Sequence, residues 1–167
     1  AMPIWALSIR IFHWSNAALF RLTYWWLEGG GRAHEGAGYA ILALVLVRIW
    51  LGFFGRGNAR FASLWPTPTR IFAYLRAFPH GDRDWPGHNP LGGLMVLFLL
   101  LMLAMTAASG WLQETDAFWG EEWPQRLHEV LADVVMVGVV VHVFAVVLMQ
   151  RLTGKALIKT MVTGKRG

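Results

Sequence analysis

The 167-residue sequence contains no cysteine, so it cannot form a disulfide framework. Charged residues are also scarce, at 15% of the chain, against roughly 25% in a soluble domain. Hydrophobic residues instead make up 56% of the chain, and the mean hydropathy is +0.43. This composition excludes an ordinary soluble domain and predicts an integral membrane protein.

Four long apolar segments account for the composition. Each is close to the roughly 20 residues that a helix needs to cross a membrane. They cover residues 9–27, 34–54, 91–112 and 127–149. We therefore expect an all-α fold, an integral membrane four-helix bundle that forms a single domain over residues 1–167.

The connections between these segments are polar or rich in turn residues. A glycine-rich turn joins the first two segments, and an acidic loop at 113–125 precedes the fourth. Residues 55–90 hold five prolines and predict a loop with one short surface helix at about residues 70–78. Residues 150–167 form a basic tail.

Basic residues gather on one side of the predicted bundle. With four spans, both termini share a side with the 55–90 loop, and this side holds most of the arginines and lysines. By the positive-inside rule, both termini are therefore expected in the cytoplasm. The net charge of +5 thus needs no nucleic acid partner to explain it.

Two histidines stand out in the fourth apolar segment. His128 and His142 are fourteen residues apart, so on a helix they differ by about 40° in azimuth and about 21 Å along the axis. Both histidines therefore lie on one face of the predicted helix, near its opposite ends. Imidazole is a common ligand of haem iron. Because the chain lacks a C-x-x-C-H motif, any haem would be held noncovalently.

Each of these histidines has a candidate partner at the same depth. By residue count, His13 lies roughly 6 Å and His142 roughly 10 Å inside the cytoplasmic boundary. His34 and His128 both stand at the opposite boundary. Pairing by depth predicts His13 and His142 as iron ligands of a cytoplasmic-side haem, and His34 and His128 as iron ligands of an outer-side haem. The third apolar segment carries no histidine and receives no ligand.

The histidines also have other interpretations. A histidine at a helix end, such as His34 or His128, is ordinarily an interfacial polar residue. His142 differs because it lies in a valine-rich run, where an ionisable residue indicates function by default. A histidine-lined metal or proton transporter would instead cluster its polar residues near the midplane. His80 and His88, in the 55–90 loop, have no partner at equal depth and are interpreted as surface residues.

Charges and a glycine inside the spans give further predictions. Arg48 is fourteen residues beyond His34, on the same helical face, so we expect it to bind a haem propionate; snorkelling to the nearby interface is the alternative. Arg21 and Asp133 lie at similar depth and could form an ion pair. Gly138 could bring a porphyrin close to the backbone, or equally allow close helix packing.

Short motifs follow one another along the chain in a specific order. They are IFHW at 11–14, VRIWLGF at 47–53, GHNPLG at 87–92, LHEVLAD at 127–133, VHV at 141–143 and KTMVTGKR at 159–166. In this order they resemble the bacterial cytochrome b561 and nickel-iron hydrogenase cytochrome b family over nearly the whole chain. The resemblance implies a four-helix membrane protein with two b-type haems, whose ligands fall on His13, His34, His128 and His142.

The resemblance also implies a function. Such a protein passes electrons between the membrane quinone pool and a periplasmic redox partner, either a c-type cytochrome or a dehydrogenase. We expect a multi-pass protein of the bacterial inner membrane that contacts lipid and quinone, with a homodimer as a candidate assembly. The alternative is a membrane anchor and electron-conduit subunit of a larger redox complex, with no substrate site of its own. Only the first function, electron transfer with the quinone pool, would make this chain a quinone-linked oxidoreductase.

Overall fold

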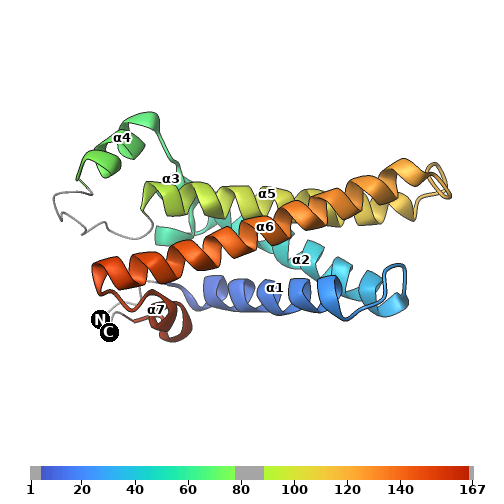
Figure 1. Cartoon of the computed structure of the whole chain (residues 1–167), viewed down its shortest axis with the longest axis horizontal. Helices are drawn as coiled ribbons and strands as arrows, with labels where there is room; N and C mark the ends of the chain where they lie inside the picture. Colours follow the sequence, from blue (N-terminus) through green and yellow to red (C-terminus); the bar gives the residue numbers. More distant parts are fainter. Residues whose placement is uncertain (1–4, 78–88, 166–167) are drawn as a thin grey trace.

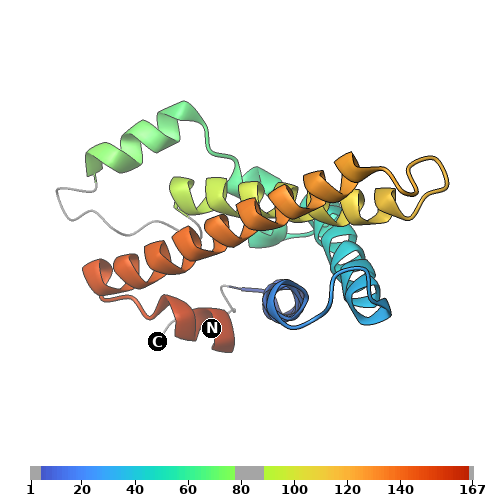
Figure 2. The ribbon, with the colours of Figure 1, turned by 45° about the vertical axis from the view of Figure 1, so that its right-hand side comes forward.

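The protein is an all-helical bundle. Its structure, a computed structural model, describes residues 5–77 and 89–165, and every regular element in these ranges is a helix. The four long helices are α1 (Leu7–Trp25), α2 (Arg32–Phe54), α5 (Pro90–Gln113) and α6 (Glu122–Thr153). Figures 1 and 2 show the α1–α2 and α5–α6 connections at one end of the bundle, and Figure 1 shows the start of α1 at the other. The all-α prediction is therefore confirmed.

Three of these helices are long and apolar enough to cross a membrane, namely α2, α5 and α6. The prediction of four such spans is wrong for α1 by this measure. The physical reason is that two arginines, a histidine and an asparagine fall within the 19 residues of α1 and make it too polar. The bundle nevertheless keeps α1 as its fourth long helix, packed against α2.

The ends of the long helices follow local sequence signals. Asn89 caps α5, because its side-chain oxygen accepts a hydrogen bond from the Gly92 backbone N–H at 2.6 Å and a proline takes the first helical position. Helix α6 stops at Gly154, which adopts a left-handed conformation with φ of 70°. With 32 residues, α6 is about 48 Å long and exceeds the predicted segment 127–149 at both ends.

The segment between α2 and α5 is more ordered than predicted. It contains a 3-10 turn η1 (Gly57–Ala59), α3 (Phe61–Leu64) and α4 (Pro68–Ala77). Helix α4 confirms the predicted short surface helix. The prediction of a loop with one short helix over 55–90 did not include η1 and α3, in which Ala59 and Leu64 are buried. His80 and His88 lie outside the described residues.

The basic tail also folds back onto the bundle. After Gly154 the chain forms α7 (Leu157–Thr163), beside the start of α1. The Arg10 guanidinium donates to the Val162 carbonyl, and Trp14 Nε1 donates to the Met161 carbonyl at 3.3 Å. These bonds hold the C-terminal helix against α1 near His13.

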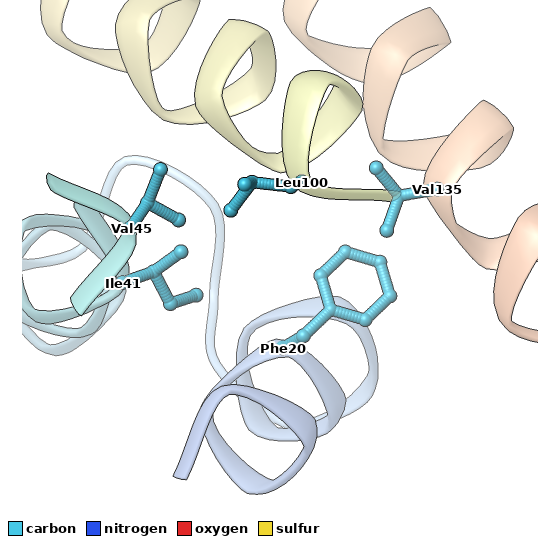
Figure 3. Packing of buried hydrophobic residues seen from close by; sticks show 5 residues of the cluster. All are labelled: Phe20, Ile41, Val45, Leu100 and Val135. Atoms are coloured by element: carbon cyan, nitrogen blue, oxygen red, sulfur yellow. The ribbon is translucent and has the colours of Figure 1, made fainter. Parts of the chain in front are cut away.

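All four long helices contribute to the hydrophobic core. The cluster consists of Phe20 from α1, Ile41 and Val45 from α2, Leu100 from α5 and Val135 from α6. Figure 3 shows these side chains converging between the helices. Since α5 packs closely on both α2 and α6, and α1 packs on α2, the helices form a stable frame for the side chains between α1 and α6.

Candidate functional site

The first histidine pair lies between α1 and α6, toward the end of the bundle where α1 begins. The ring centres of His13 and His142 are 6.3 Å apart, with an angle of 57° between the ring planes. Both rings are partly buried, and Trp14 stacks edge-on against His13. His13 Nδ1 is buried and has no hydrogen-bond partner in the described part of the chain.

The second pair lies at the other end of the same helical frame, between α2 and α6. The ring centres of His34 and His128 are 6.1 Å apart, and the planes are inclined at 72°. His34 Nδ1 is another buried polar atom with no hydrogen-bond partner among the described residues. The structure therefore places together the same two pairs that the depth argument predicts, although the role of these residues as ligands stays a prediction.

The spacing of both pairs suits two imidazoles on one iron. An imidazole nitrogen binds a metal ion at about 2.0 Å, and the ring centre lies ~1 Å further away, so the centres of two opposed ligands are about 6 Å apart. The observed 6.3 and 6.1 Å agree with this value. The residues thus fit bis-histidine ligation of two haems.

An apolar layer separates the two pairs. Val135 is seven residues from both His128 and His142, which is about 10 Å along α6 in each direction. It is 1% exposed and belongs to the core cluster with Phe20. The core therefore keeps the two pairs at separate depths.

The ring of His128 has polar partners that sequence reasoning missed. Its Nδ1 lies 2.9 Å from the Thr106 carbonyl oxygen and 3.2 Å from Ser109 Oγ, both on α5. The signal was present in the sequence, because these two hydroxyl residues interrupt a segment that is otherwise almost wholly apolar. Which side of α5 faces His128 was not visible from that pattern.

Gly138 serves helix packing in the structure. A Cβ at this position would lie 2.9 Å from Leu99 Cδ2 and 3.0 Å from Phe98 Cε1, both side chains of α5. Of the two interpretations of Gly138, the structure therefore favours close approach of α5 and α6.

Asp133 has a partner on α1, but it is not Arg21. The Tyr24 hydroxyl donates to Asp133 Oδ1 at 2.7 Å, whereas the Arg21 guanidinium lies over the Trp26 ring at 4.9 Å. The prediction of an Arg21–Asp133 contact is wrong because Tyr24, three residues further along α1, faces α6 while Arg21 faces outward.

Arg48 is buried inside the protein at 3% exposure. Its Nη1 donates to the Ala59 carbonyl at 2.9 Å, and its guanidinium carbon lies 5.2 Å from the centre of the Phe61 ring. This arrangement differs from snorkelling, since the side chain does not reach the surface. Arg48 thus joins α2 to the η1–α3 segment, and binding of a haem propionate by Arg48 stays a prediction.

The variant Arg48→Gln separates these two roles. If Arg48 is structural, loss of the bond to the buried Ala59 carbonyl should cost about 1–3 kcal/mol, seen as a lower thermal midpoint in detergent with an unchanged haem content. Arg76→Gln, at an exposed position of α4, is the matched control and should behave like the wild type. A haem loss or spectral change without loss of stability would instead assign Arg48 to a propionate.

Comparisons with known proteins identify the family of this chain. The sequence profile of prokaryotic cytochrome b561 matches residues 4–164. A probable Ni/Fe-hydrogenase B-type cytochrome subunit from Azotobacter vinelandii is 26% identical in an alignment 163 positions long, and the alignment covers 80% of this chain and 67% of that protein. The search of solved structures found no significant match. Because the profile extends over nearly the whole sequence, this chain belongs to the prokaryotic cytochrome b561 family of haem-containing membrane electron-transfer proteins.

Proposed function

We propose that this chain is a dihaem b-type cytochrome that carries electrons across the bacterial inner membrane. His13 and His142 hold one haem iron, and His34 and His128 hold the other. The observation that carries the proposal is the pair of ring separations, 6.3 and 6.1 Å, at two depths of one bundle. Haem b supplies reversible one-electron chemistry when bound.

The protein residues supply ligation, burial and separation. Two histidines at each iron would favour electron transfer over binding of a small molecule. The core cluster around Val135 excludes water between the two sites.

We further propose that α1 crosses the membrane as a fourth helix, with both termini in the cytoplasm. Two of its polar side chains donate hydrogen bonds inside the protein: Asn16 Nδ2 donates to the Phe12 carbonyl, and the Arg10 guanidinium donates to the Val162 carbonyl. Asn16 Oδ1 and Arg10 Nε are buried without a partner among the described residues. Arg21 lies near the end of α1, where its stem can reach the interface. The basic residues at the end where α1 begins support the orientation.

Within the membrane, the proposed electron donor is quinol, or the proposed electron acceptor is quinone. A groove of about 420 Å³ runs between α5 and α6, and Asp133 is the charged residue in its otherwise apolar lining. An apolar groove with one polar group suits a quinone ring with a lipid-like tail. Asp133 is five residues from His128, about 8 Å further along α6, so it lies between the levels of the two histidine pairs.

The redox partner is proposed to be a periplasmic protein, either a c-type cytochrome or a dehydrogenase. The relative from Azotobacter vinelandii carries the name of a hydrogenase subunit, which supports a partner of the dehydrogenase kind. The same name favours the second candidate function, an electron-conduit subunit with no quinone site of its own.

A haem count followed by a quinol titration tests the proposal. Detergent-purified protein should contain two b haems per chain in a pyridine haemochrome assay, and a short-chain quinol should reduce them without oxygen present. Protein made with ample haem that nevertheless contains none would overturn the cytochrome assignment. Two haems that quinol fails to reduce would favour the conduit function.

A further inference from the structure

The helix without a haem ligand holds the ring of one proposed ligand. On α5, the Thr106 carbonyl and the Ser109 hydroxyl both lie within hydrogen-bond distance of His128 Nδ1, at 2.9 and 3.2 Å. Ser109 Oγ also donates to the Thr106 carbonyl at 2.8 Å. Thr106 is 9% and Ser109 4% exposed, so water does not compete strongly for these bonds.

These contacts determine which nitrogen of His128 carries the proton. A carbonyl oxygen can only accept a hydrogen bond, so Nδ1 must be the protonated nitrogen of the neutral ring. The other nitrogen, Nε2, then keeps its lone pair and is free to bind iron. The ring is thus prepared for ligation through Nε2 before any haem binds.

Two other proposed ligands lack such a partner. His13 Nδ1 and His34 Nδ1 are buried without a hydrogen bond in the described part of the chain. His128 therefore differs from these two proposed ligands, because α5 anchors its ring.

We propose that α5 lowers the reduction potential of the haem between His34 and His128, through the hydrogen bond from His128 Nδ1 to the Thr106 carbonyl, with Ser109 Oγ as a second acceptor. The inference rests on the proposed function, in which these histidines bind haem. A hydrogen bond from Nδ1 makes Nε2 a stronger electron donor, and a stronger donor favours ferric over ferrous iron.

Gly110→Ala tests the contact sterically. A Cβ at residue 110 would lie 3.2 Å from His128 Cε1 and 3.4 Å from Nδ1, so the ring must move by a few tenths of an ångström and its bond to Thr106 must weaken. In a redox titration, the midpoint of one haem should rise while the other stays unchanged. We expect the ferric-to-ferrous ratio of that haem to fall at least about threefold at a fixed potential, where tenfold corresponds to about 59 mV.

Ser109→Ala is a second, milder variant that removes only the second acceptor. It should raise the midpoint of the same haem by a smaller amount, and Ser109→Thr, which keeps a hydroxyl, should restore it. The control is Gly36→Ala, since residue 36 lies on an exposed face of α2 with no atom within 4 Å of a new Cβ. The low-spin electron paramagnetic resonance signal of the affected haem should shift with the midpoint.

The haem count separates the possible failures. Two haems per chain with unchanged midpoints in Gly110→Ala and Ser109→Ala would overturn the role of α5 while leaving the dihaem function intact. Wild-type protein without haem would overturn the proposed function itself. If Gly110→Ala loses haem, its midpoint cannot be compared with the wild type. The midpoints of Ser109→Ala and Ser109→Thr then test the role of α5.

Discussion

Replacing His142 with alanine should lower the haem content of the purified protein from two b haems per chain to one. The reason is that His142 supplies one of two imidazoles at the site it shares with His13, and a single remaining ligand binds the iron far more weakly. The measurement is a pyridine haemochrome assay normalised to protein concentration. Val143→Ala is the matched control, since residue 143 is the next residue of α6 and its side chain is 54% exposed. Retention of two haems with an unchanged spectrum in His142→Ala would contradict the assignment.

The same assay tests which histidines share a haem. His13→Ala should lose the haem that His142→Ala loses, so the double variant of these two should still retain one haem. His142→Ala combined with His128→Ala should retain none, because the two changes affect different sites. The pairing would be wrong if the His13 and His142 changes removed separate haems.

Replacing Gly93 with alanine should strongly destabilise the bundle. Gly93 is buried on α5, and an added Cβ would overlap the backbone carbonyl of Leu64 in α3. A backbone atom cannot rotate away as a side chain can, so α3 and α5 must separate. Overpacking of this kind typically costs about 1–3 kcal/mol and occasionally more. Thermal unfolding in detergent, followed by circular dichroism, should show a lower midpoint.

Gly36→Ala is the control for this substitution too. An alanine there meets no neighbouring atom, and within a helix it is favoured over glycine by about 1 kcal/mol. Its thermal midpoint should therefore equal or exceed that of the wild type. If Gly93→Ala unfolded at the same temperature as this control, the close contact between α3 and α5 would not exist in the membrane protein.

The long helices and the levels of the histidines could be predicted from the sequence. Three of the four predicted apolar segments correspond to helices suited to crossing a membrane, since a run of about 20 apolar residues has few other stable arrangements. The fixed rise of a helix then converts residue number into depth. That is why His13 could be matched with His142, and His34 with His128, before any contact was known.

The structure decided what depends on how each helix is rotated about its axis. Residue number places Arg21 and Tyr24 of α1 at similar depths, but only the packing shows that Tyr24 faces Asp133. Sequence reasoning likewise gave no indication that Arg48 bonds the Ala59 carbonyl.

The sequence by itself therefore determined the helical class, the apolar segments and the two histidine levels, because these follow from local composition and helix geometry. Only the tertiary structure decided which face of α5 meets His128 and which helices pack most closely. The physical reason is that a lipid-exposed helix is apolar on nearly every side, so its hydrophobic pattern does not identify the face that packs inward. That face is selected by small residues such as Gly93 and Gly138 and by a few polar contacts between helices.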